Sequence, residues 1–585
     1  MPYFLLSTTS PLLQSWYSRT NRHAMPYRLF ALSNLSSLFG LLAYPCFVEP
    51  KLTLSEQSGY WSGAYAAFTV LCAVTASAST KSGKGENPGT ADVENSSGNE
   101  PAPPATREKI LWMFLAACAS VLLLSTTNYL TQDIASIPFL WVLPLSLYLL
   151  SFILCFDRNG WYRRGLYVWI MASVLGSMAY ALVQWSANYD IEIKIPFFCT
   201  GLFACCMFCH GELAVRKPAP RYLTSFYLMI SLGGALGGVL VCIIVPKTLS
   251  GPFEFAIALS ACALLLFLVN FRRTWINGAV CGLLVGAMVY STCIYISSFV
   301  SKSRFLARNF YGCLKVEEYD TGTRNEHRNL VNGVIIHGIQ FQAPGRRKEP
   351  VSYYSPDSGI GLAIQSLPKK ARRVGIIGLG VGTLAGYARH GDYFHFYEIN
   401  PIVKDVALKE FSFLSECRGK TEISIGDGRL LLQQEHDQQY DLLAVDAFSG
   451  DSIPVHLLTA EAVQLYFRHL KPDGILALHI TNTNLDLVPV VGRIREVLGK
   501  HAVLIRHEGD VADEIYNSTW VLMTTGRDLM TIAGIRKASG TLENRTDIRV
   551  WTDDYSNLIQ IIKHTGSFMD GLYGTGGIPH SDVLP

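Results

Sequence analysis

The sequence predicts two fold classes in one chain: an N-terminal polytopic α-helical membrane domain, and a C-terminal Rossmann-like α/β domain preceded by a small antiparallel β unit. Three observations predict this arrangement. The first 300 residues contain nine apolar runs that approach the length needed to cross a bilayer. Residues 301–355 alternate apolar and polar side chains between turn signals. From residue 356 onward, short apolar runs alternate with helical segments, as in a mostly parallel sheet.

The size and charge of the chain agree with this division. A chain of 585 residues is too long for one core, and we expect three domains, at 1–300, 301–355 and 356–585. The net charge of +3 gives no argument for a nucleic-acid partner, and we expect none. The mean hydropathy of +0.24 is high for a soluble protein, so we expect the lipid bilayer as a partner of the first domain.

The nine predicted spans cover residues 29–48, 59–79, 109–130, 134–156, 164–185, 195–213, 222–245, 254–271 and 276–299. Residues 80–107 are rich in Gly, Ser, Asn, Pro and charge, which predicts a disordered loop. The segment SLGGALGG at 231–238 has small residues at a spacing typical of close helix packing.

Most of the 14 cysteines lie in the apolar runs, where we expect small core residues rather than disulfides. Cys205, Cys206, Cys209 and His210 have the spacing of a metal cluster. Their segment is typical of a membrane helix, and the sequence offers no second ligand pair. We therefore expect no metal.

In the last domain the predicted strands cover 373–377, 394–398, 422–425, 441–446, 474–480, 502–506 and 519–524, with helices at 381–390, 401–414, 457–470 and 487–499. Ligands of such sheets bind beyond the carboxyl ends of the strands. Four successive strand ends carry a signal there: Gly378, Gly380 and Gly382; Glu398 and Asn400; Asp427 and Gly428; and Asp446 with Asp451.

These strand ends predict a nucleoside-cofactor site. Glycines let the backbone approach a ligand closely, and Glu398 can accept both hydroxyls of a ribose. Asp427 can accept an adenine amino group. Each acid alone could be a helix cap or a turn residue. The series of glycine turn and three acids favours a cofactor of the S-adenosylmethionine type over NAD.

The same region resembles the spermidine/spermine synthase (polyamine aminopropyltransferase) family, whose sheet is of the class I methyltransferase type. The resemblance covers roughly residues 308–565 and rests on NFYGCLKV, VNGVIIHGIQ, SYYSPDSGIG, GLGVG, YEINP, GDGR, YDLLAVDAFSGDSIPVHLLT, HLKPDGILALHITN and WTDDYSNL. TNYLTQDIASIPFLWVLPLSLYLLSF resembles the membrane part of bacterial proteins in which a multi-span, transporter-like region is fused to such a domain.

The resemblance implies transfer of an aminopropyl group from decarboxylated S-adenosylmethionine to a diamine such as putrescine. By position, Asp446 matches the family's catalytic base. Asp451 could hold the far amine, and Tyr353 or Tyr354 matches a tyrosine beside the substrate. Gln340 matches a glutamine near the cofactor. Synthases of this family pair through their β units, which implies a homodimer.

Two departures from the family pattern leave the donor open. Val381 stands where the family has an aspartate that binds the amino group of the decarboxylated donor, and Asn400 replaces one acid after the second strand. One alternative is therefore an enzyme that acts on intact S-adenosylmethionine, such as a methyltransferase. Another is a transporter or sensor whose last domain binds a polyamine or nucleoside without turnover.

The location follows from the cofactor. We expect a multi-pass protein of the cell's inner (plasma) membrane with the catalytic domain in the cytoplasm, where such a cofactor is made. Basic residues mark cytoplasmic loops, and nine strict crossings would instead place residues 300–585 opposite the basic loops. One span is then re-entrant, or the count is off by one.

Overall fold

The computed structural model describes residues 9, 12–13, 27–82, 102–134, 139–157, 160–184, 191–271, 274–333, 335–448, 454–542 and 545–563. The chain forms two compact units, a helical unit that ends at Phe299 and an α/β unit that begins at Val300. Each unit is described by itself.

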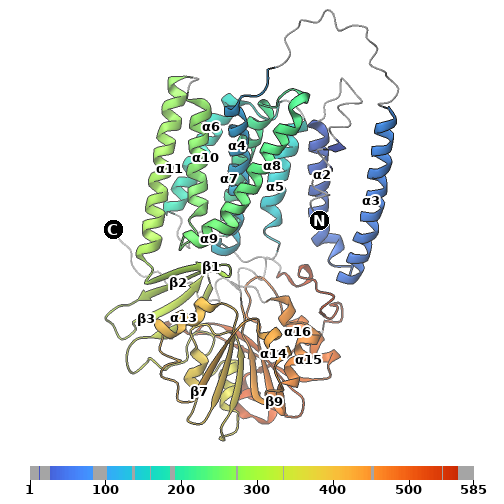
Figure 1. Ribbon diagram of the computed structural model, residues 1–585. Helices are drawn as coiled ribbons and strands as arrows, with labels where there is room; N and C mark the ends of the chain where they lie inside the picture. The colour runs from blue at the N-terminus through green and yellow to red at the C-terminus, as the bar shows by residue number, and fades with distance from the viewer. Residues whose placement is uncertain are drawn as a thin grey trace, which may run out of the picture. The chain divides into compact units, whose positions relative to one another are not determined.

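The nine predicted apolar runs all form helices (Figure 1). They are α2 (Tyr27–Ala43), α3 (Leu54–Ser82), α4 (Thr106–Asn128), α5 (Val142–Asp157), α6 (Arg164–Gln184), α7 (Ile191–Val215), α8 (Leu223–Val239), α10 (Glu254–Asn270) and α11 (Trp275–Ser301), with a short α9 (Val245–Thr248) after α8. Within the described ranges, seven helical stretches are long and apolar enough to cross a membrane. The other two, α5 and α10, have 16 and 17 residues.

The predicted loop at 80–107 is shorter than expected at both ends. α3 continues to Ser82 and α4 begins at Thr106, so helix covers the first and last residues of that range. Residues 83–101 lie outside the described residues, and the prediction of disorder stays a prediction for them.

Two glycines of SLGGALGG let α8 lie directly against α4, which confirms the predicted close packing. A Cβ atom on Gly233 would stand 2.3 Å from the carbonyl oxygen of Met113, and one on Gly237 would stand 2.8 Å from that of Ala117. The hydroxyl of Ser120 also donates to the carbonyl of Gly234 across the same contact, at 3.1 Å.

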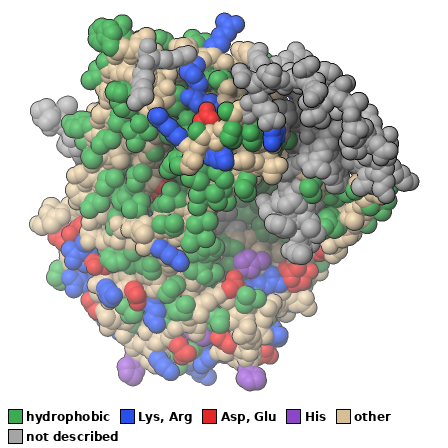
Figure 2. Space-filling model, turned by 45° about the horizontal axis from the view of Figure 1, so that its top comes forward, with side chains coloured by type: hydrophobic (Ala, Val, Ile, Leu, Met, Phe, Trp, Pro, Cys, Tyr) green, Lys and Arg blue, Asp and Glu red, His purple; other side chains and the backbone are tan. Residues whose placement is uncertain are grey.

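The outer faces of the helical unit are apolar. Figure 2 shows hydrophobic side chains gathered over its helices. Large exposed side chains of this kind include Phe39, Val70, Leu228, Leu268 and Leu283. An apolar surface that covers several helices is typical of contact with lipid or with a partner protein.

The α/β unit begins with a four-stranded antiparallel sheet of β1 (Phe305–Asn309), β2 (Gly312–Tyr319), β3 (His327–Asn332) and β4 (Ile335–Phe341), in that order. Its β3–β4 register shifts at Leu330 and Val331. One face packs on Val381, Val406 and Phe411 of the following segments. This sheet matches the predicted small β unit.

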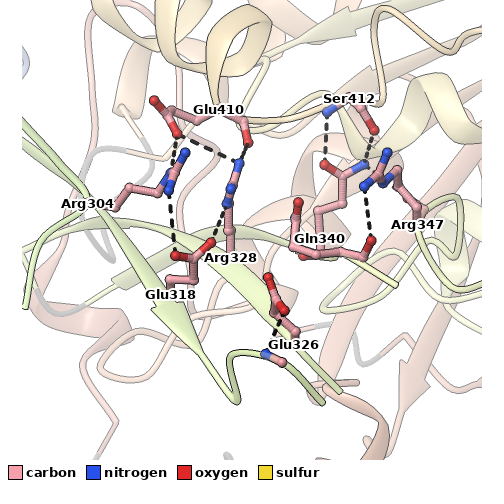
Figure 3. Close-up of polar contacts among 10 residues, drawn as sticks. Arg304, Glu318, Glu326, Arg328, Gln340, Arg347, Glu410 and Ser412 are labelled. Atoms are coloured by element: carbon pink, nitrogen blue, oxygen red, sulfur yellow. Dashed lines mark hydrogen bonds and ion pairs between the residues drawn. The ribbon is translucent and has the colours of Figure 1, made fainter. Parts of the chain in front are cut away.

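Ion pairs tie the four-stranded sheet to the segment after α13 (Pro401–Lys409). Arg304 donates to the Glu410 carboxylate at 2.8 Å, and Arg328 donates to the carboxylate of Glu318 and the carbonyl of Glu410, both at 2.9 Å. Arg304 also lies 3.6 Å from Glu318, so two arginines and two glutamates form one network (Figure 3).

The second sheet has eight strands in the order β12-β10-β11-β9-β8-β5-β6-β7. Its strands are β5 (Arg373–Ile377), β6 (Tyr393–Glu398), β7 (Lys420–Ile425), β8 (Tyr440–Val445), β9 (Leu470–His479), β10 (His501–His507), β11 (Ser518–Thr524) and β12 (Ser539–Gly540). β9, β8, β5, β6 and β7 are parallel, whereas β11, β10 and β12 extend the sheet antiparallel.

Two apolar clusters fill the two faces of this sheet. Alternate residues of β8 divide between them, with Leu443 and Val445 in one and Leu442 and Ala444 in the other. The helices of the unit are α12 (Gly359–Gln365), α13, α14 (Gly428–Gln434), α15 (Ala460–Arg468), α16 (Val488–Val497) and α17 (Ala533–Ala538).

All seven predicted strands are present, but the first predicted helix is wrong. Residues 381–390 contain only a 3₁₀ turn, Thr383–Tyr387, because Gly382 has φ +82° and Gly386 lowers the helix propensity of so short a segment. The glycine turn therefore leads into no α-helix. The predicted helix 401–414 also ends early, at Lys409.

Candidate active site

A cavity of about 510 Å³ lies in the α/β unit at the carboxyl ends of the parallel strands. The order of the strands in the sheet reverses at this point, because β6 lies on one side of β5 and the later strand β8 lies on the other side. Nine residues singled out from the sequence line the cavity: Tyr353, Tyr354, Gly378, Gly380, Glu398, Asn400, Asp427, Gly428 and Asp446.

Two residues of the glycine turn let the backbone pass close to other strands. Gly378 has φ +104°, and a Cβ there would stand 2.2 Å from the carbonyl oxygen of Asp446. Gly380 has φ +53°, and a Cβ there would stand 2.5 Å from the carbonyl oxygen of His337. Gly382 is not among the lining residues, because it packs against Leu414 instead.

Glu398, at the end of β6, is buried and holds the glycine turn. Its carboxylate accepts from the backbone N–H of Leu379 at 3.0 Å and of Asn400 at 2.7 Å. Burial raises the pKa of Glu398, and these backbone bonds act against the rise. Each carboxylate oxygen keeps a second lone pair, so the group can still accept a pair of hydroxyls from the cavity side.

Asn400 has a structural task in the described chain. Its side-chain oxygen caps α13 by accepting from the N–H of Ile402 at 3.1 Å and also accepts from the Asn309 amide at 2.7 Å. It lines the cavity, but the polar groups of its side chain are partly used by these bonds.

Asp427 is a helix cap and a cavity residue at once. One of its oxygens accepts from the N–H of Leu430 at 2.9 Å, which caps α14, and the other lies 2.8 Å from Nε2 of His456. The next residue, Gly428, packs on Ile377, where a Cβ would stand 2.7 Å from a side-chain methyl. Asp427 is therefore the helix cap that the sequence allowed, it also lines the cavity, and its role as an acceptor for an adenine amino group stays a prediction.

Asp446 follows β8, and both of its carboxylate oxygens have partners. The hydroxyl of Tyr354 donates to one at 2.6 Å, and Nδ1 of His479 lies 2.6 Å from the other. The Asp446 side chain is 9% exposed, so it is screened from bulk water but open to the cavity.

His479 was not singled out from the sequence. It ends β9, directly beside Asp446, and its ring stacks on Trp520 with centroids 4.3 Å apart and planes 7° apart. Its Nε2 lies 2.7 Å from the hydroxyl of Thr481, which accepts from the N–H of Thr519 at 2.8 Å. The rule that polar side chains gather at parallel strand ends could have found it.

The two tyrosines differ in place. Tyr354 is buried, and burial together with the nearby Asp446 raises its pKa well above the usual range, so it stays a donor to that carboxylate. The ring of Tyr353 lies against those of His479 and Tyr516, with centroids 5.4 and 5.6 Å apart. Tyr354 is thus the tyrosine that contacts Asp446.

Gln340 lies away from this cavity, contrary to the expectation. Its amide group donates to Ser412 Oγ at 2.9 Å and to the carbonyl of Arg347 at 3.0 Å, and its oxygen accepts from the N–H of Ser412 at 2.9 Å (Figure 3). These bonds use its polar atoms to join β4 to the loop after α13. Asp451 lies outside the described residues.

Val381, which stands where the resemblance expects an aspartate, is surrounded by apolar side chains. It is 1% exposed and packs with Leu314, Leu330, Val406 and Phe411. The position where the resemblance expects an aspartate is therefore part of an apolar cluster, and its side chain is not among those that line the cavity.

His337, on β4, is a further cavity residue that the sequence reading missed. Its Nε2 is buried and has no partner among the described residues. Burial lowers its pKa to about 4, although the charge of Asp446 acts in the opposite direction. The imidazole is therefore neutral at pH 7.

Comparison with known proteins finds similarity over part of the chain. No family model matches the chain. It is 29% identical to the polyamine aminopropyltransferase of Vibrio vulnificus over 157 residues, 26% of this chain and 50% of that protein. It is 25% identical to a probable polyamine aminopropyl transferase of Bifidobacterium longum over 223 residues, 37% of this chain and 45% of that protein. The chain thus spans about half the length of these relatives.

A methyltransferase is also similar over a shorter stretch. The chain is 35% identical over 109 residues to an N-terminal histidine N-methyltransferase of Emericella nidulans, 18% of this chain and 19% of that protein. Among solved structures, a probable spermidine synthase from Corynebacterium glutamicum aligns with a TM-score of 0.34 and 15% identity, over 42% of this chain and 95% of that one.

Proposed function

We propose that this chain is a membrane-bound aminopropyltransferase, which transfers an aminopropyl group from decarboxylated S-adenosylmethionine to a diamine such as putrescine. The observation that carries the proposal is the bonding of Asp446. Its carboxylate faces a cavity of about 510 Å³ and is held by Tyr354 and His479 on its two oxygens. A carboxylate held in this way can take a proton from a substrate in a defined direction.

The reaction needs a base because the acceptor enters as a cation. Asp446 attracts the ammonium group and takes one of its protons, which frees the nitrogen lone pair. The nitrogen then forms a bond to the carbon next to the sulfonium while the carbon–sulfur bond breaks, and methylthioadenosine leaves with the electron pair. Tyr354 and His479 keep Asp446 aimed at the amine.

The remaining strand ends fit the adenosyl part of the donor. Glu398 would accept the ribose hydroxyls, and Asp427 would accept the adenine amino group. Glycine at 378 and 380 allows the turn to lie close to the backbone of Asp446 and His337, where a Cβ atom would collide with a carbonyl oxygen. Tyr353 and Asp451 are proposed substrate contacts, the latter for the far amine of the diamine.

The test is a product analysis with purified full-length protein. The protein is incubated with putrescine and either the decarboxylated or the intact donor, and products are read by mass spectrometry. Methylthioadenosine and spermidine from the decarboxylated donor support the proposal. Binding of methylthioadenosine without product from either donor would favour a non-catalytic sensor or transporter and contradict it.

Turnover of intact S-adenosylmethionine is the second candidate. It is favoured by Val381, whose apolar surroundings supply no carboxylate for the amino group of the decarboxylated donor. The similarity to a methyltransferase also favours this second candidate. S-adenosylhomocysteine in the product analysis would select methyl transfer.

We further propose a multi-pass protein of the inner membrane with the α/β unit in the cytoplasm. Helices α5 and α10 are shorter than the roughly 20 residues of a typical span. If α10 does not cross, eight crossings place residues 300–585 on the side of the basic loops that precede α10, whereas the loss of α5 as a span would leave the basic loops after α5 on the other side. Reporter fusions at the C-terminus test this.

A homodimer through the four-stranded sheets is proposed as well, and light scattering in detergent tests it.

A further inference from the structure

Three cysteines from three different helices meet in the core of the helical unit. Cys118 of α4, Cys209 of α7 and Cys262 of α10 have all of their Sγ atoms within 4.8 Å of one another. All three are buried, with side chains between 0% and 8% exposed. The residues are 91 and 53 positions apart along the chain, so the packing of the helices, not local sequence, brings them together.

A fourth thiol lies beside this group. Cys205 is one helical turn before Cys209 on α7, is also fully buried, and lies near Cys262. The sequence offered no second ligand pair for the cysteines of α7, and the structure supplies one from α4 and α10. His210 is not part of the group, because its Nδ1 lies 2.8 Å from the Ser151 hydroxyl and its ring stacks on Phe152.

The separations suit one shared ion. Zinc–sulfur bonds are about 2.3 Å long, which places the sulfurs of a tetrahedral site about 3.8 Å apart. Sulfurs already within 4.8 Å of one another need to approach by no more than about 1 Å to reach that spacing. Buried thiols that serve only as small apolar residues have no need to converge, and Cys199 and Cys281, both buried in the same unit, lie outside this group.

We propose that Cys118, Cys209 and Cys262 bind a thiophilic metal ion, Zn²⁺ or Cu⁺, with Cys205 as a fourth donor. The donor set contains only sulfur, which favours these soft ions over Mg²⁺ or Ca²⁺. Each thiol that becomes a ligand loses its proton to solvent as its bond to the ion forms, so binding strengthens as the pH rises. No electron transfer is involved. The ion would join α4, α7 and α10 at one point.

The test uses full-length protein without a polyhistidine tag, purified in detergent under reducing, oxygen-free conditions. The protein is incubated with Zn²⁺ or with a Cu⁺ chelate, washed with a chelator, and assayed for metal per chain. We expect about one equivalent of one of the two ions, and X-ray absorption at the metal edge showing sulfur neighbours at about 2.3 Å. The two arms decide which ion it is.

Variants identify the ligands. Cys118→Ala and Cys262→Ala should lose the bound equivalent, whereas Cys199→Ala, which removes an equally buried thiol of α7, should keep it. A monodisperse elution profile checks that each variant is folded. The measurement on the wild type tests the proposal by itself, so a variant that fails to fold does not leave the proposal untested. Wild type that retains no metal, or holds it through nitrogen and oxygen neighbours, overturns the proposal. A disulfide among these cysteines in protein kept oxygen-free also overturns it.

Discussion

Asp446 and His479 lie side by side at the carboxyl ends of two neighbouring parallel strands, with 2.6 Å between a carboxylate oxygen and Nδ1. β8 and β9 are paired in parallel, so their ends bring these side chains to the same edge of the sheet. The stacking of His479 on Trp520 fixes the imidazole plane. The pair is therefore held by backbone pairing and by ring packing at once.

Replacement of the proposed base should stop turnover without removing the binding site. In Asp446→Asn the side chain keeps its shape but cannot take a proton, so we expect kcat to fall by about 10²- to 10⁴-fold. Calorimetry should find the affinity for methylthioadenosine within a fewfold of wild type. Asp473→Asn, an exposed residue of β9, is the control. Full activity in Asp446→Asn would exclude it as the base.

His479 should act as a positioning residue for Asp446. His479→Ala should lower kcat about tenfold to a hundredfold with little change of KM, since it removes a bond to the carboxylate worth about 1–3 kcal/mol. His479→Asn, whose amide can replace Nδ1, should recover part of the rate. A rise of KM in place of the fall of kcat, or no recovery in His479→Asn, would indicate a merely structural role.

Glu398 and Gln340 should separate binding from stability. Glu398→Gln places an amide where two backbone N–H groups now donate, and we expect the affinity for methylthioadenosine to fall about tenfold to a hundredfold, as for 1–3 kcal/mol. Gln340→Ala removes the three bonds to Ser412 and Arg347. It should lower the thermal midpoint of the α/β unit and leave that affinity unchanged. Loss of binding in Gln340→Ala alone would restore it as a site residue.

Protonation of His337 should destabilise the α/β unit in acid. Its pKa is lowered to about 4, so between the ordinary value near 6.5 and 4 the unfolded chain takes up the proton first. Stability should fall as the pH decreases through this window, by at most about 3 kcal/mol. His337→Asn lacks this contribution. The measurement is the unfolding midpoint of wild type minus that of the variant, at pH 7 and at pH 5. This difference should be smaller at pH 5 than at pH 7, because only the wild type loses stability when unfolded His337 takes up a proton. An equal difference at the two pH values would contradict the prediction.

Adjacent glycines of α8 provide a matched test of the contact with α4. Gly233→Ala puts a methyl group 2.3 Å from the Met113 carbonyl oxygen and should destabilise the helical unit by about 1–3 kcal/mol. A Cβ on Gly234 meets nothing within 4 Å, so Gly234→Ala should stay within about 1 kcal/mol of wild type. Thermal unfolding in detergent measures both. Equal effects would mean that α8 does not lie against α4 in this way.

The sequence predicted what depends on local pattern. Apolar runs fixed the helices of the first half, and strand ends carried Glu398, Asp427 and Asp446 to one cavity because parallel strands share an edge. Contacts between distant segments were not visible. Gln340 bonds to Ser412, which is 72 residues away, and the three cysteines come from helices that no sequence period relates. Residues 381–390 contain a 3₁₀ turn instead of the predicted helix, because Gly382 has a positive φ and Gly386 lowers the helix propensity.

The burial of Val381 limits how the choice of donor could be redesigned. A carboxylate introduced there would lie among Leu314, Val406 and Phe411, and burying an unpaired charge is costly. Val381→Asp would therefore be expected to loosen the join between the two sheets before it could attract an amino group. Engineering of substrate preference in this protein would have to begin from side chains that do line the cavity, such as Tyr353 and Tyr516.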